Sequence, residues 1–341
     1  PFSVGGDWIH PVRPPDRGPP GPPRTPARSG SGTAGRPAPL GGALDQARLG
    51  AALARLAATP VERLLSRPEL PARDALSARG LPSRTIDGFL RPLLSALLCD
   101  PGLTTSSRCA ALRQAEAAAR EGVQPDLLAA ALPPGTVRTG VRVTSVSTST
   151  VGTAEHGEFR CRAVLLATDA RAAADLLPGL RVPPFHELTV VHHTAPEPPL
   201  EGPALLLDAD RAGPVAHTAV VSQVDPSRAP ADRVLISSTV LGPPPQEHVV
   251  RAHLAALYGT PTHRWELLAV HHTREAVPAM PPPHDARRPV RLLAGLYVCG
   301  DHRDTSTVQG ALHSGRRAAH ACLTDFGITP AYAREQLPAA A

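Results

Sequence analysis

Apolar positions recur at helical spacing between residues 44 and 132, which predicts a helix-rich segment. Leu49, Leu53 and Leu56 share one face of a first helix that must end before Pro60. Further helices are expected over residues 83–98 with a kink at Pro92, over 107–121 with Gly122 as C-cap, and over 126–132.

From residue 133 onward, short apolar runs bounded by Gly and Pro predict strands instead. The expected strands cover residues 137–146, 159–168, 188–194, 204–207, 215–224, 234–240, 266–272 and 295–301. Asp169 is a candidate N-cap for a helix over 170–177. Two more helices are expected over 246–258 and 307–325.

Residues 1–43 are rich in Pro, Gly and Arg, so we expect them to be disordered or irregular, and we assign residues 329–341 as a C-terminal tail. Gly30, Gly32 and Gly35 spell the G-x-G-x-x-G dinucleotide fingerprint. That fingerprint works where a strand delivers the glycines to a helix start, and here Pro-rich sequence flanks them on both sides. We therefore interpret the three glycines as part of a loop.

Composition removes several classes of enzyme. The chain of 341 residues has 35 basic residues, all Arg, against 30 acidic ones. Without any Lys, a Schiff-base enzyme and a P-loop NTPase are both excluded. The Arg residues are scattered and aromatics make up only 3% of the chain, so nucleic acid is not an expected partner.

The five cysteines form no CxxC pair, which favours a reducing, cytoplasmic setting over a disulfide framework. No run of about 18 apolar residues predicts a transmembrane helix. The chain starts at Pro1 without a signal segment, so we expect its natural start to lie elsewhere. His192-His193 and His271-His272 lie in predicted strands, where neighbours point to opposite faces, and no metal site is expected.

The last strand and helix carry the most informative pattern. A strand ends in Gly300-Asp301, and a helix opens with Thr307-Val308-Gln309-Gly310-Ala311. A helix start offers free amides and partial positive charge, and a carboxylate at a strand end can accept hydrogen bonds from hydroxyls, which together suit FAD. The plain alternatives are a solvated turn at His302, Arg303 and Asp304, and simple close packing through the small residues 310, 311, 314, 315, 318 and 319.

Residues 296–319 closely resemble the C-terminal flavin motif of the flavin-containing amine oxidase and phytoene desaturase superfamily. Residues 89–92 with 103–108, 139–143 with 163–169, and Trp265 with 279–281 resemble other segments of its bacterial, desaturase-like branch, so the resemblance covers about residues 44–325. It implies FAD as cofactor, with Val143 by the adenine and Ala167 and Thr168 near the pyrophosphate. Gly300 and Asp301 would meet the ribityl and pyrophosphate region, and residues 307–311 the flavin ring.

The resemblance implies an α/β fold of the FAD-linked reductase type, with a truncated FAD-binding layer beside a mixed β-sheet and helical substrate domain. Residues 44–132 would be its helical part, 133–185 an FAD-binding segment, 186–289 the β-rich substrate domain and 290–328 the C-terminal FAD-binding strand and helix. The family's opening strand, glycine-rich turn and ribose-binding acid are not found, nor is a Gly-Gly-Met-type segment near residues 122–132. We expect either a unit upstream of Pro1 or a degenerate copy.

The activity implied is hydride removal from a C–H bond of an amine or of an apolar, carotenoid-like substrate. The missing Lys favours the desaturase-like branch, and we name no catalytic acid or base. The alternative is a non-catalytic remnant or binding protein that keeps the substrate-domain fold. Peripheral membrane contact is a third expectation by analogy. The sequence leaves the oligomeric state open.

Overall fold

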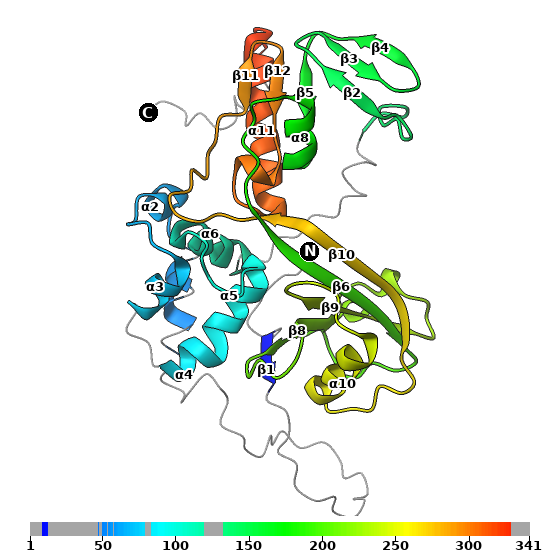
Figure 1. Ribbon diagram of the computed structural model, residues 1–341. Coiled ribbons are helices and arrows are strands. Elements are labelled where there is room, and N and C mark those ends of the chain that lie inside the picture. The colour runs from blue at the N-terminus through cyan, green and yellow to red at the C-terminus, as the bar shows by residue number, and fades with distance from the viewer. Residues whose placement is uncertain are drawn as a thin grey trace, which may run out of the picture.

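The computed structural model describes residues 9–12, 47, 50–52, 54–56, 58–78, 83–118 and 132–328. A helical lobe, a large sheet and a smaller layer of two three-stranded sheets make up the molecule (Figure 1). This arrangement agrees with the α/β class and with the predicted change from helices to strands near residue 133.

The large sheet has the strand order β1-β7-β8-β9-β6-β10. Its strands are β1 Ile9–Val12, β6 Phe185–Ala195, β7 Leu205–Asp208, β8 Val215–Val220, β9 Val234–Val240 and β10 Glu266–Pro278. Helix α10, Glu247–Tyr258, covers one face, where Val191, Ile236 and Leu254 are buried in one apolar cluster. Alternation along the strands puts Val191 and Ile236 on the same side of the sheet, where Leu254 of the helix packs against them. The helix and the sheet therefore share a core.

Three predictions for this region need correction. Residues 9–12, expected to be irregular, form β1, which pairs parallel with β7. The predicted strand 215–224 ends at Val220 and continues as helix α9, Val221–Val224, followed by the 3-10 turn η2, Pro226–Arg228. The strand ends there because Ser222 Oγ accepts from Leu235 N at 3.0 Å, where a backbone carbonyl would otherwise continue the ladder. Strand β10 is also longer than predicted.

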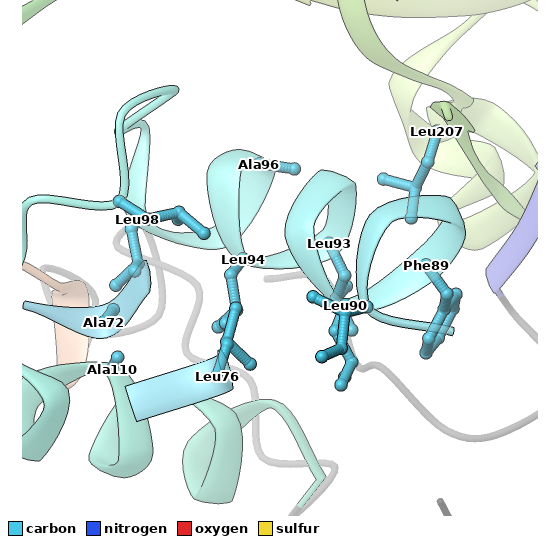
Figure 2. Packing of buried hydrophobic residues seen from close by; sticks show 12 residues of the cluster. Ala72, Leu76, Phe89, Leu90, Leu93, Leu94, Ala96, Leu98, Ala110 and Leu207 are labelled. Atoms are coloured by element: carbon cyan, nitrogen blue, oxygen red, sulfur yellow. The ribbon is translucent and has the colours of Figure 1, made fainter. Parts of the chain in front are cut away.

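The helical lobe consists of short helices around α5, and residues 50–52 and 54–56 are also helical. Its elements are α2 Val61–Leu65, α3 Ala72–Ser77, α4 Ser83–Thr85, the π-helix η1 Ile86–Leu90, α5 Arg91–Leu98 and α6 Ser107–Ala118. Leu207 of β7 packs with Phe89 and Leu93 in the core of this lobe, which joins the lobe to the large sheet (Figure 2). The predicted cap at Gly122 and most of the predicted helix 126–132 lie outside the described residues.

At Pro92 the structure shows a π-helical turn in front of the proline. Pro92 lacks an N–H and its ring crowds the carbonyl four residues earlier, so an ordinary α-helical turn is disfavoured here. The wider turn of η1 lies where that crowding would occur, and α5 continues as a regular helix with Pro92 near its start.

The smaller layer holds the sheet β11-β12-β5 and the meander β2-β3-β4. Its elements are β2 Val143–Val146, β3 Thr150–Thr153, β4 Gly157–Arg160, β5 Val164–Leu166, α8 Ala170–Leu176, β11 Arg291–Leu293, β12 Leu296–Val298, the 3-10 turn η3 Asp301–Arg303 and α11 Val308–Asp325. Asp169 caps α8 as predicted, because its carboxylate accepts from Ala172 N at 2.8 Å.

Three strand predictions in this layer were wrong in extent. The run 295–301 is a strand only over Leu296–Val298, and Asp301 already begins the turn η3. The run 159–168 is split between β4 and β5, which belong to different sheets. Cys161 N still donates to Ser149 O and so extends the pairing of β4 with β3, and β5 begins only at Val164, where it pairs with β12. The run 137–146 is a strand only from Val143 onward, and Val137 is exposed. Among the described residues, no helix is both long enough and apolar enough to cross a bilayer.

Candidate functional site

The parallel pairing of β5 with β12 brings two distant parts of the sequence together. Cys299 N donates to Leu166 O at 2.8 Å, so both strands end at the same edge of the sheet. Ala167 and Thr168 follow β5, and Gly300 and Asp301 follow β12. The predicted pyrophosphate and ribityl segments therefore lie side by side, at the kind of edge where α/β proteins bind ligands.

Gly300 occupies a position that a side chain could not share. Its φ is 144°, and a Cβ built there would lie 2.6 Å from His302 Cε1 and 3.2 Å from Thr168 O. The buried Ser314 Oγ accepts from Gly300 N at 2.9 Å and lies 2.8 Å from both Gly300 O and Ala311 O. One hydroxyl thus fixes the turn against α11, which confirms close packing at Ser314.

The helix expected from about residue 307 is α11, and the side chain of Thr307 caps its start. Thr307 Oγ1 accepts from Gly310 N at 2.8 Å, and Thr307 O accepts from Ala311 N at 2.9 Å. Because these contacts engage only part of the first turn, the helix start keeps its partial positive charge beside the turn at Gly300. Val308 is 64% exposed and Gln309 is half-buried, so a ligand can reach this end.

The small residues of α11 have different roles. A Cβ at Gly310 would lie 2.0 Å from Thr305 O, so the helix approaches the preceding loop closely there. A Cβ at Gly315 would meet nothing within 4 Å, so the expected close packing at that position is wrong. Gly315 lies on a side of the helix without a near neighbour, whereas Gly310 faces the loop.

The loop after Asp301 is not a solvated turn. The side chain of Asp301 is 33% exposed, as a ligand-facing carboxylate must be, but His302 and Asp304 are buried. Asp304 Oδ2 accepts from His313 Nδ1 at 2.8 Å and from Arg317 Nη2 at 3.1 Å. The carboxylate therefore ties the loop to α11 two turns along the helix.

Hydrogen bonds from an arginine to backbone carbonyls also hold this loop in place. Arg317 donates to the carbonyls of Arg288 and Arg303, at 2.9 Å and 2.8 Å. Burial, together with the charges of Arg288 and Arg317, lowers the pKa of Arg303. Sequence reasoning missed this network, although His313 and Arg317 stand four residues apart, a spacing that places both side chains on one face of a helix.

Val143 belongs to a different sheet from the strand that leads to the turn at Gly300. It opens β2 in the meander and is 38% exposed. Its predicted place by the adenine stays a prediction.

The paired histidines point to opposite faces of the large sheet, as expected for a strand. His193 is buried beside Trp265, with ring centroids 6.0 Å apart, whereas His192 faces His271 at 5.5 Å. Burial lowers the pKa of His192 and of His193. Within the described ranges, no three His, Cys, Asp or Glu side chains are grouped to hold a metal ion.

Comparisons with known proteins indicate the family and the fold of the chain. A family model described as flavin containing amine oxidoreductase matches residues 28–323. An oxidoreductase from Methanosarcina mazei has a TM-score of 0.55 and 14% identity, over 81% of this chain and 72% of that one. No curated protein matches.

Two further solved structures share the fold. A triple mutant of putrescine oxidase has a TM-score of 0.52 and 15% identity, over 82% of this chain and 74% of its own. Reduced UDP-galactopyranose mutase has a TM-score of 0.53 and 14% identity, over 84% of this chain and 72% of its own. At these identities the likeness concerns the fold alone.

Proposed function

The chain belongs to the flavin containing amine oxidoreductase family, and on that premise we propose that it binds FAD against the start of α11. With FAD bound there, it would remove a hydride from a C–H bond of an amine or of an apolar, carotenoid-like substrate. The cofactor supplies the hydride-accepting chemistry, and the chain's own residues position it.

The turn at Gly300 and Asp301 carries this proposal. Gly300 lets the turn approach His302 and Thr168 more closely than a residue with a Cβ could, and Ser314 holds the turn against α11. Asp301 keeps a partly exposed carboxylate that can accept hydrogen bonds from the sugar-alcohol hydroxyls of FAD. The residues present therefore fit the flavin half of the cofactor.

The capped start of α11 is the second feature that supports FAD binding. Its free amides and partial positive charge stabilise negative charge that develops on a bound ring. Thr307 Oγ1 already accepts from Gly310 N, so its contribution is to hold the helix start in place. Val308 and Gln309 would provide the contact surface.

The ADP half of FAD is less well supported. The exposed Ala167 and Thr168 end an outer strand, since β5 pairs only with β12 in the described part of the chain. The glycine pattern at residues 30–35 lies outside the described residues. This favours one alternative function, a non-catalytic binding protein that keeps the substrate-domain fold.

Flavin uptake separates these two functions. The full chain is purified, its flavin absorbance is recorded, and FAD is titrated into the apoprotein. We expect saturable binding that Asp301→Ala weakens about tenfold, the loss of one charge-assisted hydrogen bond. Asp232→Ala, which removes an exposed carboxylate from a distant loop, serves as the control and should bind like the parent.

Lack of binding by the parent chain would overturn the FAD proposal and leave the binding-protein alternative. Equal binding by the parent and Asp301→Ala would overturn the assigned role of Asp301. If FAD binds, anaerobic bleaching of the flavin by small amines or by apolar polyenes distinguishes the substrate classes. Flotation with liposomes tests our further proposal that an apolar substrate is taken from a membrane surface.

A further inference from the structure

A cavity of about 460 Å³ lies between the helical lobe and the loop that follows β10. The end of α2, the segment after it, the start of α6 and residues 283–287 form its walls. Its volume falls within the range of small-molecule sites. Gly300, Asp301 and the start of α11 do not line it, so it is separate from the site described above.

Glu69 forms a rigid acidic wall of this cavity. Its side chain is 13% exposed, and Oε1 accepts from Ser106 Oγ at 2.6 Å and from His284 N at 3.0 Å. The second oxygen, Oε2, lies 3.8 Å from Arg108 Nη1, too far for a hydrogen bond. Arg108 cannot simply move closer, because its Nε already donates to Arg67 O at 2.6 Å.

Residues 285 and 287 add a second pair of charges to the lining of the cavity. Asp285 Oδ1 accepts from Arg287 N at 2.8 Å, which fixes the short turn. The guanidinium of Arg287 is 48% exposed and lies 3.5 Å from Glu62 Oε1. Such an exposed ion pair contributes little and exchanges readily with a ligand.

The balance of charge selects the ligand. The lining holds two guanidinium groups and two carboxylates, at Arg108, Arg287, Glu69 and Asp285. A simple anion or a simple cation would meet repulsion as well as attraction at this short range. A molecule with one charge of each sign can place its carboxylate by the arginines and its ammonium by the acids.

The remaining wall is apolar and leaves room for an aliphatic substituent. Leu65 and Ala286 line it, and both pack in a cluster with the buried Cys109 and Met280. We propose that this cavity binds a small zwitterion of the α-amino acid class, with an aliphatic side chain against Leu65 and Ala286. The proposal is independent of flavin binding.

Calorimetry with three matched probes tests the charge requirement. L-Leucine carries both charges, 4-methylpentanoate lacks the ammonium, and isopentylamine lacks the carboxylate. We expect the full chain, at low ionic strength, to bind L-leucine about tenfold more tightly than either single-charge probe. Equal affinities for all three, or no heat with L-leucine, would refute the proposal.

Two variants locate the site. Glu69→Gln keeps an acceptor for Ser106 and His284 but removes the charge, so it should lose most of the preference for L-leucine over 4-methylpentanoate. Arg287→Gln changes a half-exposed side chain and should bring L-leucine down to the level of isopentylamine. If circular dichroism shows that Glu69→Gln does not fold, the affinity of Arg287→Gln for L-leucine tests the location of the site instead.

Arg171→Gln is the matched control, because Arg171 is a similarly exposed arginine, paired with Glu275 away from the cavity. It should bind L-leucine like the parent chain. If Arg171→Gln loses as much affinity as Arg287→Gln, binding is a general charge effect and the cavity is not the site.

Discussion

The large sheet and the β11-β12-β5 sheet differ in how well each is enclosed by its own chain. Helix α10 covers one face of the large sheet, where Val191, Val215, Ile236 and Leu254 are all at most 2% exposed. In the smaller sheet Leu165, at the centre of β5, is 39% exposed, and β5 pairs on one side only within the described residues.

The candidate cofactor residues belong to the less enclosed region. Ala167, Thr168 and Val308 are exposed there. Between them, Ser314 Oγ accepts a hydrogen bond from the turn at Gly300, and the carboxylate of Asp304 accepts from His313 and Arg317. The large sheet is covered by α10 on one face and is joined to the helical lobe through Leu207. The smaller layer instead keeps a few polar contacts in place around a surface that a ligand can cover. Substitutions in each region should therefore have different consequences.

Leu254→Ala should have the largest effect, because Leu254 is fully buried where α10 meets the sheet. Loss of its side chain leaves a cavity and should lower the free energy of unfolding by about 3 kcal/mol. Chemical denaturation monitored by circular dichroism measures the change. Val249→Ala, on the exposed side of the same helix, should change it by less than about 0.5 kcal/mol, and equal losses would contradict the packing described.

His253→Ala comes next, because it breaks a buried polar contact in the same region. His253 Nε2 lies 3.3 Å from Asp208 Oδ2, and His253 Nδ1 accepts from Val215 N at 3.2 Å. Removal of the ring leaves a buried carboxylate and a buried N–H without that partner, at a cost of about 2 kcal/mol. The same denaturation experiment applies, and a loss below about 0.5 kcal/mol would show that the contact is not structural.

The same carboxylate predicts a dependence on pH. Burial by itself would raise the pKa of Asp208, but hydrogen bonds from His253 and from the N–H groups of Ala212 and Gly213 lower it overall. A lowered pKa stabilises the fold above the unfolded value of about 3.9, and this contribution is lost as the pH falls through the folded value. Asp208→Asn should therefore flatten the acid limb of a stability-against-pH curve, and an unchanged limb would contradict this assignment.

The sequence predicted well those elements whose pattern is local. The cap at Asp169, strand β9 and helices α10 and α11 all follow from neighbouring residues, and the structure has them. The glycine and acid at 300 and 301 were likewise visible as a strand end. These features depend on contacts within a few residues, which a single sequence records.

The features that the sequence did not predict depend on contacts between residues far apart in the chain. The split of residues 159–168 between two sheets depends on the pairing of β4 with β3 and of β5 with the distant β12, and the burial of Asp304 depends on His313 and Arg317. The strand at residues 9–12 forms by pairing with β7, nearly two hundred residues away, despite its Pro-rich surroundings. Tertiary contacts decided these cases over local preference.

Substitution by Ala at two glycines of the smaller layer should change the free energy of unfolding in opposite directions. Gly300→Ala forces a side chain into a backbone with φ 144° and against His302, so it should cost about 1–3 kcal/mol. Gly315→Ala adds a methyl group to open space within α11 and should stabilise the helix by about 1 kcal/mol. Hydrogen exchange should show faster exchange at the start of α11 in the first variant, with the large sheet unchanged. Faster exchange throughout the sheet would mean that the two regions unfold together.

The smallest effect is expected at an ion pair that connects the two regions. Arg171 of α8 and Glu275 of β10 are bonded through Nε and Oε2 at 3.2 Å, with side chains 52% and 42% exposed. Exposed pairs gain little in water, because solvent screens the charges and ordering two long side chains costs entropy. Arg171→Gln, Glu275→Gln and the double variant should therefore leave the denaturation midpoint unchanged within error, in low and high salt alike. A measurable coupling between the two substitutions, lost in high salt, would show that the smaller layer depends on the large sheet through charge, and that the two regions are less independent than their packing indicates.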